Sequence, residues 1–287
     1  MRFSQALLFL FVIVSITFAA CIPSAPTLAA SPTTVMVKPT ANAPSPTSTN
    51  WWHPMPGLTW QWHLSDPPVD TSVDAQVYDI DLFDNDASVI DDLHARGRKV
   101  ICYISAGSRE EWRPDASQFP PEVVGKDYEG WPGEKWLDIR QVDKLAPIMR
   151  ARLDLCAAKG FDAVEPDNME VSTNDSGFPI TAQDEIRYAL WLANEAHTRG
   201  LAIGMKNAPH LVRDLLPHFD FAIAEDCFVY GWCEQLSPFI QAGKPVFAAE
   251  YTDTALDFND ACQIAQDLNF SVILKKRMLA AFRIACP

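Results

Sequence analysis

The segment KGFDAVEPDN, residues 159–168, holds the structural unit that recurs along most of this chain. A helical pattern runs from Val142 to Lys159 and stops at Gly160, the residue type expected just past a helix C-terminus. The short apolar run Asp162–Asp167 follows and ends in acidic side chains. Short apolar runs bounded by turn residues are typical of buried parallel strands. The segment therefore predicts a helix, a tight turn and a strand of a parallel α/β fold.

Eight such runs occur from Trp51 onward: Thr59–Leu64, Gln76–Leu82, Lys99–Ser105, Asp162–Asp167, Ala202–Lys206, Phe219–Glu225, Pro245–Tyr251 and Ser271–Lys275. Amphipathic helical windows lie between most of them: Ala87–Arg96, Val142–Lys159, Ala182–Arg199, Pro209–Leu215, Glu234–Ala242 and Phe258–Asp267. Eight strands in about 235 residues predict a single-domain (β/α)8 TIM barrel over residues 51–287. The alternative is an open doubly wound sheet, which is poorly supported because no G-x-G-x-x-G follows the first strand.

The first fifty residues have a different composition. Arg2 precedes an apolar run, Ala6–Ala20, that is too short for a membrane span but fits a signal peptide. The run ends in FAAC, residues 18–21, which resembles a bacterial lipobox and predicts lipid attachment at Cys21. The alternative is an ordinary signal peptide cleaved nearby. Both readings predict export, and the lipobox reading predicts anchoring to the cell envelope and its membrane.

Residues 22–50 are rich in proline, threonine and serine and contain one charged residue, Lys38. Such a segment cannot bury enough apolar surface to offset the entropy lost on ordering, and its prolines favour an extended conformation. We expect it to be a tether between residues 1–21 and the barrel.

The net charge of −14 limits the partners of the protein. Binding of nucleic acid requires basic patches, so this class of partner is not expected. An acidic surface attracts polycations, although a soluble acidic exported protein would carry the same charge for other reasons.

Six cysteines follow Cys21, and an even number in an exported chain predicts disulfides. Proximity in sequence favours the pairs Cys227–Cys233 and Cys262–Cys286, which leaves Cys102 and Cys156 to pair with each other. The spacing of cysteine and histidine indicates no zinc site.

Polar side chains stand at the ends of most predicted strands, and the strand ends of a TIM barrel meet at the face that carries the active site. These residues are Asp79, Asp81, Tyr103, Glu165, Asp167, Lys206, Asn207, Glu225, Glu250 and Tyr251. A single acid there could simply cap the next helix. Several on one rim predict a catalytic site, because crowded carboxylates raise one another's pKa and so provide an acid and a base.

A long segment, Arg109–Arg140, follows the third strand and carries Trp112, Trp131 and Trp136. It predicts either an aromatic wall on which sugars stack or a local packing cluster.

Several of these motifs together resemble glycoside hydrolase family 114. They are VICYISAG (100–107), GFDAVEPDN (160–168), GMKN (204–207), EDCF (225–228) with Tyr230 and Cys233, and GKPVF (243–247) with Glu250 and Tyr251. The resemblance implies a TIM-barrel endo-α-1,4-polygalactosaminidase acting on galactosamine-containing exopolysaccharide. It implies that Asp167 and Glu225 are the catalytic pair. The chain departs from the family pattern at Glu165, Met169-Glu170 and Asp226, which bears on subsite specificity.

Two carboxylates suffice for glycoside hydrolysis, so no metal or cofactor is expected. Glu225 is the expected acid, and Asp167 the nucleophile, or the base if the reaction inverts. The expected sugar-binding residues are Asp79, Asp81, Tyr103, Lys206, Asn207, Glu250 and Tyr251. Asp79 and Asp81 could instead modulate the pKa of other acids, and Lys206 could equally form a structural ion pair with a carboxylate. Two other classes stay open, namely a lipoprotein that binds carbohydrate without cleaving it and a metal-dependent deacetylase.

Overall fold

All eight predicted strands form, and they lie parallel to one another in chain order. They are β1 (Trp60–His63), β2 (Val77–Asp81), β3 (Lys99–Ser105), β7 (Ala163–Asp167), β8 (Ala202–Lys206), β9 (Phe221–Glu225), β10 (Val246–Tyr251) and β11 (Ser271–Lys275). A short antiparallel strand, β12 (Ile284–Ala285), follows β11 at the edge of this curled sheet. The prediction of a TIM-barrel fold is confirmed.

This computed structural model describes residues 50–287. The predicted signal peptide with Cys21, and the tether up to residue 49, lie outside the described residues. Within the described part of the chain, no helix combines the length and the apolar character needed to cross a membrane.

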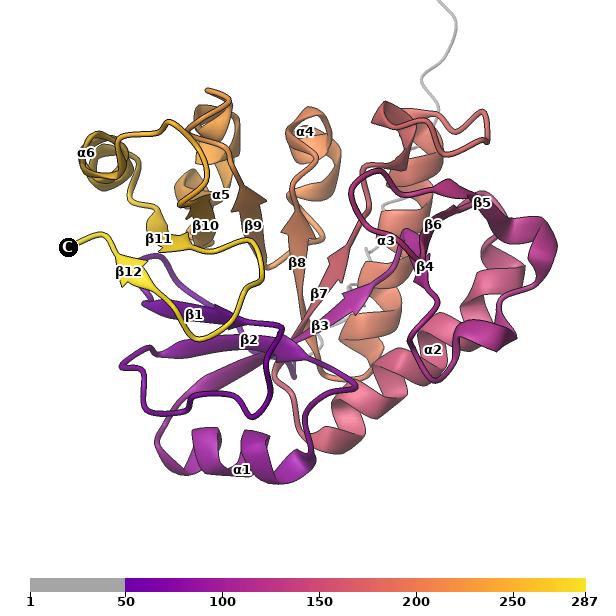
Figure 1. Cartoon of the computed structure of the whole chain (residues 1–287), viewed down its shortest axis with the longest axis horizontal. Helices are drawn as coiled ribbons and strands as arrows, with labels where there is room; N and C mark the ends of the chain where they lie inside the picture. Colours follow the sequence, from indigo (N-terminus) through magenta and orange to yellow (C-terminus); the bar gives the residue numbers. More distant parts are fainter. Residues whose placement is uncertain (1–49) are drawn as a thin grey trace, which may run out of the picture. The chain divides into compact units, whose positions relative to one another are not determined.

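The helices surround the strands (Figure 1). They are α1 (Ala87–Ala95), α2 (Val142–Lys159), α3 (Ala182–Thr198), α4 (Val212–Leu215), α5 (Ser237–Gln241) and α6 (Phe258–Leu268). Gly160 ends α2 at a φ of 91°, and Thr181 begins α3 with a capping box to Asp184. Two predicted helices are each split into a 3₁₀ turn and a short α-helix. These turns are η4 (Pro209–Leu211) and η5 (Cys233–Leu236), and Pro238 opens the α-helix after η5.

Side chains on the strands alternate between two apolar layers, as the period of two in a strand requires. One set fills the barrel interior and includes Trp60, Trp62, Ile101, Phe221 and Phe247. The other set, which includes Tyr78, Val100, Val164, Ile203 and Ala248, belongs to the larger core with the helices. Polar residues in register with the first set, such as Asp79, Glu165 and Lys206, are therefore expected to point into the barrel.

The barrel departs from the ideal pattern at its seam. No helix lies between β1 and β2, and the segment after β11 bridges β1 and β11 instead. Leu64 N donates to Leu279 O at 2.8 Å, and Arg283 Nε donates to Trp60 O at 2.7 Å. Directly across the seam, Trp60 Nε1 donates to Ser271 O at 2.9 Å. The C-terminal segment thus takes the place of an eighth helix.

The three predicted disulfides are confirmed, namely Cys102–Cys156, Cys227–Cys233 and Cys262–Cys286. Cys102–Cys156 joins β3 to α2. Cys262–Cys286 fastens the end of the chain to α6, beside the seam.

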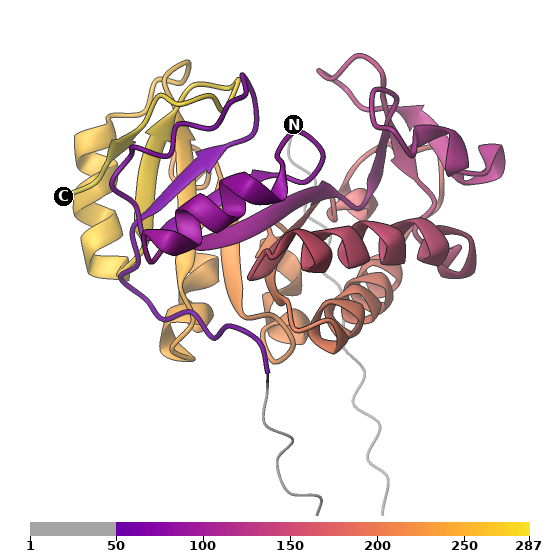
Figure 2. The same ribbon diagram turned by 90° about the horizontal axis from the view of Figure 1, so that it is seen from below.

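The long segment after β3 forms its own antiparallel sheet in the order β4-β6-β5. Its strands are β4 (Ser108–Glu110), β5 (Val124–Asp127) and β6 (Glu134–Leu137), with two 3₁₀ turns, η1 (Ala116–Gln118) and η2 (Pro121–Val123). A further 3₁₀ turn, η3 (Val171–Thr173), follows β7. Figure 2 shows this insertion, in magenta, on the same end of the barrel as the indigo loop after β1.

Gly204 provides a test of packing inside the barrel. A Cβ atom at this position would lie 2.3 Å from the Phe221 ring, so Gly204→Ala should lower the free energy of unfolding by about 1–3 kcal/mol in urea titrations. Adding Phe221→Leu should recover part of the loss. A Gly204→Ala protein as stable as the parent would contradict this packing.

Candidate active site

A cleft of about 430 Å³ opens at the carboxyl ends of the strands. Its walls come from the loop after β1, the β4–β6 insertion and the C-terminal segment. Seven carboxylates line it, against the two guanidinium groups of Arg113 and Arg277. These acids are Asp66, Asp84, Glu110, Glu134, Asp167, Glu170 and Glu225.

Asp167 lies at the end of β7 on the floor of this cleft, and three donors hold its carboxylate. The Tyr103 hydroxyl donates to Oδ2 at 3.0 Å. The Asn168 backbone N–H donates to Oδ1 at 2.8 Å, and Lys206 Nζ donates to the same oxygen at 2.9 Å. These bonds stabilise a negative charge on Asp167 and fix its orientation.

Glu225 occupies the equivalent position at the end of β9. Lys206 Nζ lies 3.0 Å from its Oε2, and the Tyr251 hydroxyl donates to Oε1. Its backbone N–H donates to the side chain of Asn207 at 2.9 Å. Asn168, Asn207 and Asp226 each follow the last residue of a strand with a φ near +50 to +60°. This left-handed conformation, which Asn and Asp tolerate, turns the chain away sharply and leaves the strand end facing the cleft.

Lys206 connects the two acids. Its side chain is entirely buried, and Nζ also donates to Glu165 at 2.9 Å. Burial alone would lower the pKa of Lys206, but Asp167, Glu165 and Glu225 together raise it well above its usual value. The Trp62 ring, whose centroid lies 4.6 Å from Nζ, covers the ammonium group. One cation therefore holds three carboxylates.

The shared contact limits the distance between the two cleft acids. Because Asp167 Oδ1 and Glu225 Oε2 both lie within 3.0 Å of Lys206 Nζ, these oxygens are at most about 6 Å apart. Carboxyl pairs at such distances can flank one glycosidic bond.

Residues 41–287 match the Glycoside-hydrolase family GH114. The chain belongs to this family. A crystal structure of Ega3 from Aspergillus fumigatus in complex with galactosamine is 42% identical, covers 82% of this chain and 97% of its own, and superimposes with a TM-score of 0.79. The glycoside hydrolase domain of PelA from Pseudomonas aeruginosa is 11% identical, with a TM-score of 0.63 over 80% of this chain and 98% of that domain. This second likeness shows the fold alone.

A curated protein of Deinococcus radiodurans, described as uncharacterized, is 27% identical over 195 residues. The aligned region covers 60% of this chain and 62% of that relative. Membership in GH114, with the close structural match to Ega3, makes this protein a glycosidase.

Five of the seven acids that line this GH114 cleft are not among the residues predicted from the sequence, and two of the five, Glu134 and Glu170, have pKa values raised to near neutrality. Burial raises the pKa of Glu134 and of Glu170 to about 7, and the charge of Asp167 adds to the effect at both. Glu134 Oε1 accepts from Asn168 Nδ2 at 2.8 Å and from the Ser108 hydroxyl. Glu134 comes from the insertion, so no strand-end pattern points to it, whereas Glu170 lies three residues beyond Asp167.

Tyr103 and Asn207 line the cleft, whereas five other residues expected to contact sugar do not line it: Asp79, Asp81, Lys206, Glu250 and Tyr251. Lys206 and Tyr251 bind the two catalytic candidates from below. Asp81 forms two hydrogen bonds with Arg113, at 3.0 and 2.6 Å, and so fastens the insertion to β2. Lys206, Tyr251 and Asp81 thus contact other residues of the site rather than the open cleft.

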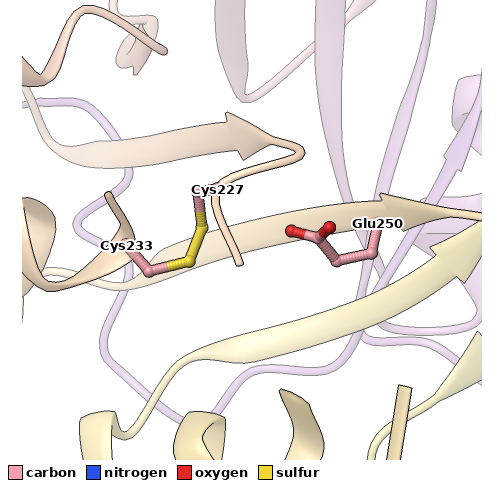
Figure 3. Close-up of side chains that lie close together, drawn as sticks. All are labelled: Cys227, Cys233 and Glu250. Carbon is pink, nitrogen blue, oxygen red and sulfur yellow. A yellow bond between two sulfur atoms is a disulfide. The ribbon is translucent and has the colours of Figure 1, made fainter. Parts of the chain in front are cut away.

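Glu250 lies on the helix-facing side of β10, where it accepts the backbone N–H groups of Phe228 and Val229. Figure 3 shows its carboxylate beside the Cys227–Cys233 disulfide. The ligating atoms of these three residues lie within 4.8 Å of one another, which is the one such group of potential metal ligands in residues 50–287. Because the sulfurs are bonded to each other and the carboxylate is occupied by backbone, this corner orients the loop after β9.

Replacing Lys206 tests its bridging role. Lys206→Met would leave three carboxylates without their cation, so unfolding free energy should fall by about 3–5 kcal/mol near neutral pH. The loss should shrink in acid, where the carboxylates can take up protons.

Lys275→Met is the matched control, since Lys275 is also buried in the barrel. Its ammonium binds neutral acceptors, Gln61 Oε1 and Ala280 O, and burial lowers its pKa to about 7. Above that pH, Lys275→Met should lower the free energy of unfolding less than Lys206→Met does. Equal costs for the two variants would contradict the bridging role.

Proposed function

We propose that this GH114 enzyme hydrolyses α-1,4 linkages in a cationic, galactosamine-containing polysaccharide, with Asp167 and Glu225 as its catalytic pair. The observation that carries the proposal is the pair itself, two carboxylates exposed to one cleft and held to a common ammonium group, Lys206.

The reaction we propose is a retaining one. The two oxygens that face Lys206 are at most about 6 Å apart, which fits the ~5–5.5 Å of retaining enzymes better than the ~6.5–9.5 Å of inverting ones. Glu225 takes up a proton from solvent before this step. Asp167 then attacks the anomeric carbon while Glu225 gives that proton to the departing glycosidic oxygen. A covalent glycosyl–Asp167 ester results. Water then loses a proton to Glu225 and displaces Asp167, so the product keeps the α configuration and both groups return to their starting states.

The charge of the cleft supports a cationic substrate. Seven carboxylates against two arginines favour protonated amines, and charge-assisted hydrogen bonds to them are stronger than neutral ones. Glu134 and Glu170, with pKa values of about 7, gain negative charge as pH rises through neutrality. The galactosamine bound to Ega3 points to the same class of sugar.

Two tryptophans of the insertion extend the cleft. Trp112 and Trp131 are 51% and 49% exposed, and both line it. Exposed indoles in a ligand cleft offer flat apolar surfaces for sugar rings. Trp136, by contrast, is buried against Tyr128, so it belongs to local packing.

We propose that the predicted export and anchoring at Cys21 would place this cleft on polymer outside the membrane.

Neutral replacement of either acid tests the catalytic assignment. Asp167→Asn and Glu225→Gln should each lower kcat by about 10³-fold or more on defined galactosamine oligomers, since each removes one half of the chemistry. Chain lengths would be followed by mass spectrometry, with Asp92→Asn on the surface of α1 as control. If the parent protein bound the polymer without cleaving it, a carbohydrate-binding lipoprotein would be supported instead. If its activity were lost in EDTA, a metal-dependent hydrolase would be supported.

Tryptophan variants test the extended cleft. Trp112→Ala and Trp131→Ala should raise KM for long chains by about tenfold each, equivalent to ~1.4 kcal/mol of binding. The shortest cleavable oligomers should be affected least. An equal effect on every chain length would place these rings outside the polymer path.

A further inference from the structure

Asp79 is a fully buried acid beneath the site. It lies on β2 with a side chain that is 0% exposed, below the cleft rather than on its wall. Charged groups from two other strands face it, namely Glu165 and Asp167 on β7 and Lys206 on β8. An ionised carboxylate in such a place needs donors, because burial of an unpaired charge is strongly unfavourable.

No N–H or hydroxyl group of the described residues donates to either oxygen of Asp79. The group within hydrogen-bond reach is another carboxyl, that of Glu165. Two adjacent carboxyl groups can form a hydrogen bond only if one of them carries a proton.

The donors around the pair decide which acid holds that proton. Burial raises the pKa of Glu165 as well, but Glu165 accepts from Trp62 Nε1 at 3.1 Å and from Lys206 Nζ at 2.9 Å, and both bonds favour its negative charge. Asp79 has neither kind of bond. Burial, and then the charge of Glu165, raise the pKa of Asp79 well above its usual value, and Lys206 opposes this only in part.

We propose that Asp79 keeps its proton at neutral pH and donates it to Glu165, and that this acid pair, with a single negative charge, positions Lys206 between Asp167 and Glu225. Asp79 is thus a positioning residue that acts through Glu165 and Lys206. Its effect on catalysis rests on the proposed function, but its protonation does not.

The proton sets the charge balance beneath the site. With Asp79 neutral, one ammonium group serves three carboxylates, and it lies within 3.0 Å of each. Loss of the proton would add a fourth negative charge beside Glu165 and draw Lys206 away from the cleft acids. Activity should therefore fall when Asp79 ionises at alkaline pH.

Asp79→Asn is the informative variant, because the amide keeps the donor and the shape but cannot ionise. It should retain kcat within about threefold near neutral pH and move the alkaline limb of the kcat profile to higher pH. Asp79→Ala, which removes the donor to Glu165, should lose activity at every pH. An Asn variant with an unshifted alkaline limb, or as inactive as the Ala variant, would overturn the positioning role.

The stability test needs no substrate. A carboxyl group whose pKa is higher in the folded than in the unfolded state stabilises the fold fully at pH values below its unfolded pKa. This stabilisation is lost as pH rises through the folded pKa. Asp79→Asn cannot suffer this loss, so its Tm relative to the parent should rise from about pH 4 to about pH 8. Asp81→Asn is the matched control on the same strand. Because Asp81 is paired with Arg113, the Tm of that variant should be lower than the Tm of the parent near neutral pH.

Spectroscopy tests the proton directly. The infrared difference spectrum of parent minus Asp79→Asn at about pH 8 should contain the carbonyl band of a protonated carboxylic acid. If the variant does not fold, carboxyl ¹³C NMR of Asp-labelled parent should show one aspartate that stays protonated at this pH. Absence of the band and of this resonance would overturn the proposal, whatever the outcome of the hydrolysis assays. A protein that shows the proton but cleaves no galactosamine polymer would instead refute the proposed function alone.

Discussion

A single buried ammonium group underlies the arrangement of this site. Lys206 neutralises charge on Glu165, Asp167 and Glu225, none of which could be crowded together without a cation. The same three contacts fix the spacing of the two acids that face the cleft. The same ammonium group therefore offsets the electrostatic repulsion and sets the catalytic geometry, and the Trp62 ring packs over it.

The barrel makes this arrangement possible through strand alternation. The inward positions of β2 and β7 place Asp79 and Glu165 inside the barrel, below the cleft. The last residues of β7 and β9, Asp167 and Glu225, lie above them at the cleft itself. Left-handed residues directly after the strands, Asn168, Asn207 and Asp226, then turn the chain aside and keep the cleft open. The insertion and the C-terminal segment, which also closes the seam, supply the walls.

Much of this could be predicted from the sequence. Strand and helix positions followed from short apolar runs and glycine stops, the disulfides from sequence proximity, and Asp167 and Glu225 from strand-end position and family motifs. Depth within the barrel could not be predicted, since it depends on register between strands. The sequence therefore leaves two roles open for Asp79, sugar ligand or pKa modulator, and two for Lys206, ion pair or sugar contact. Glu134 and the Arg113–Asp81 pair depend on how the insertion folds back, which no local pattern encodes. Alternation along β10 turns Glu250 towards the helices, which its position at the strand end alone does not indicate.

The central claim is that Asp167 and Glu225 cut a glycosidic bond by double displacement across the Lys206 bridge. Incubation with a 5-fluoro galactosaminyl fluoride, which slows turnover of a covalent intermediate, followed by peptide mass spectrometry tests it most directly. The account predicts a glycosyl adduct on the peptide that contains Asp167. An adduct on a different side chain, or turnover of α-linked oligomers with inversion and no adduct, would contradict it.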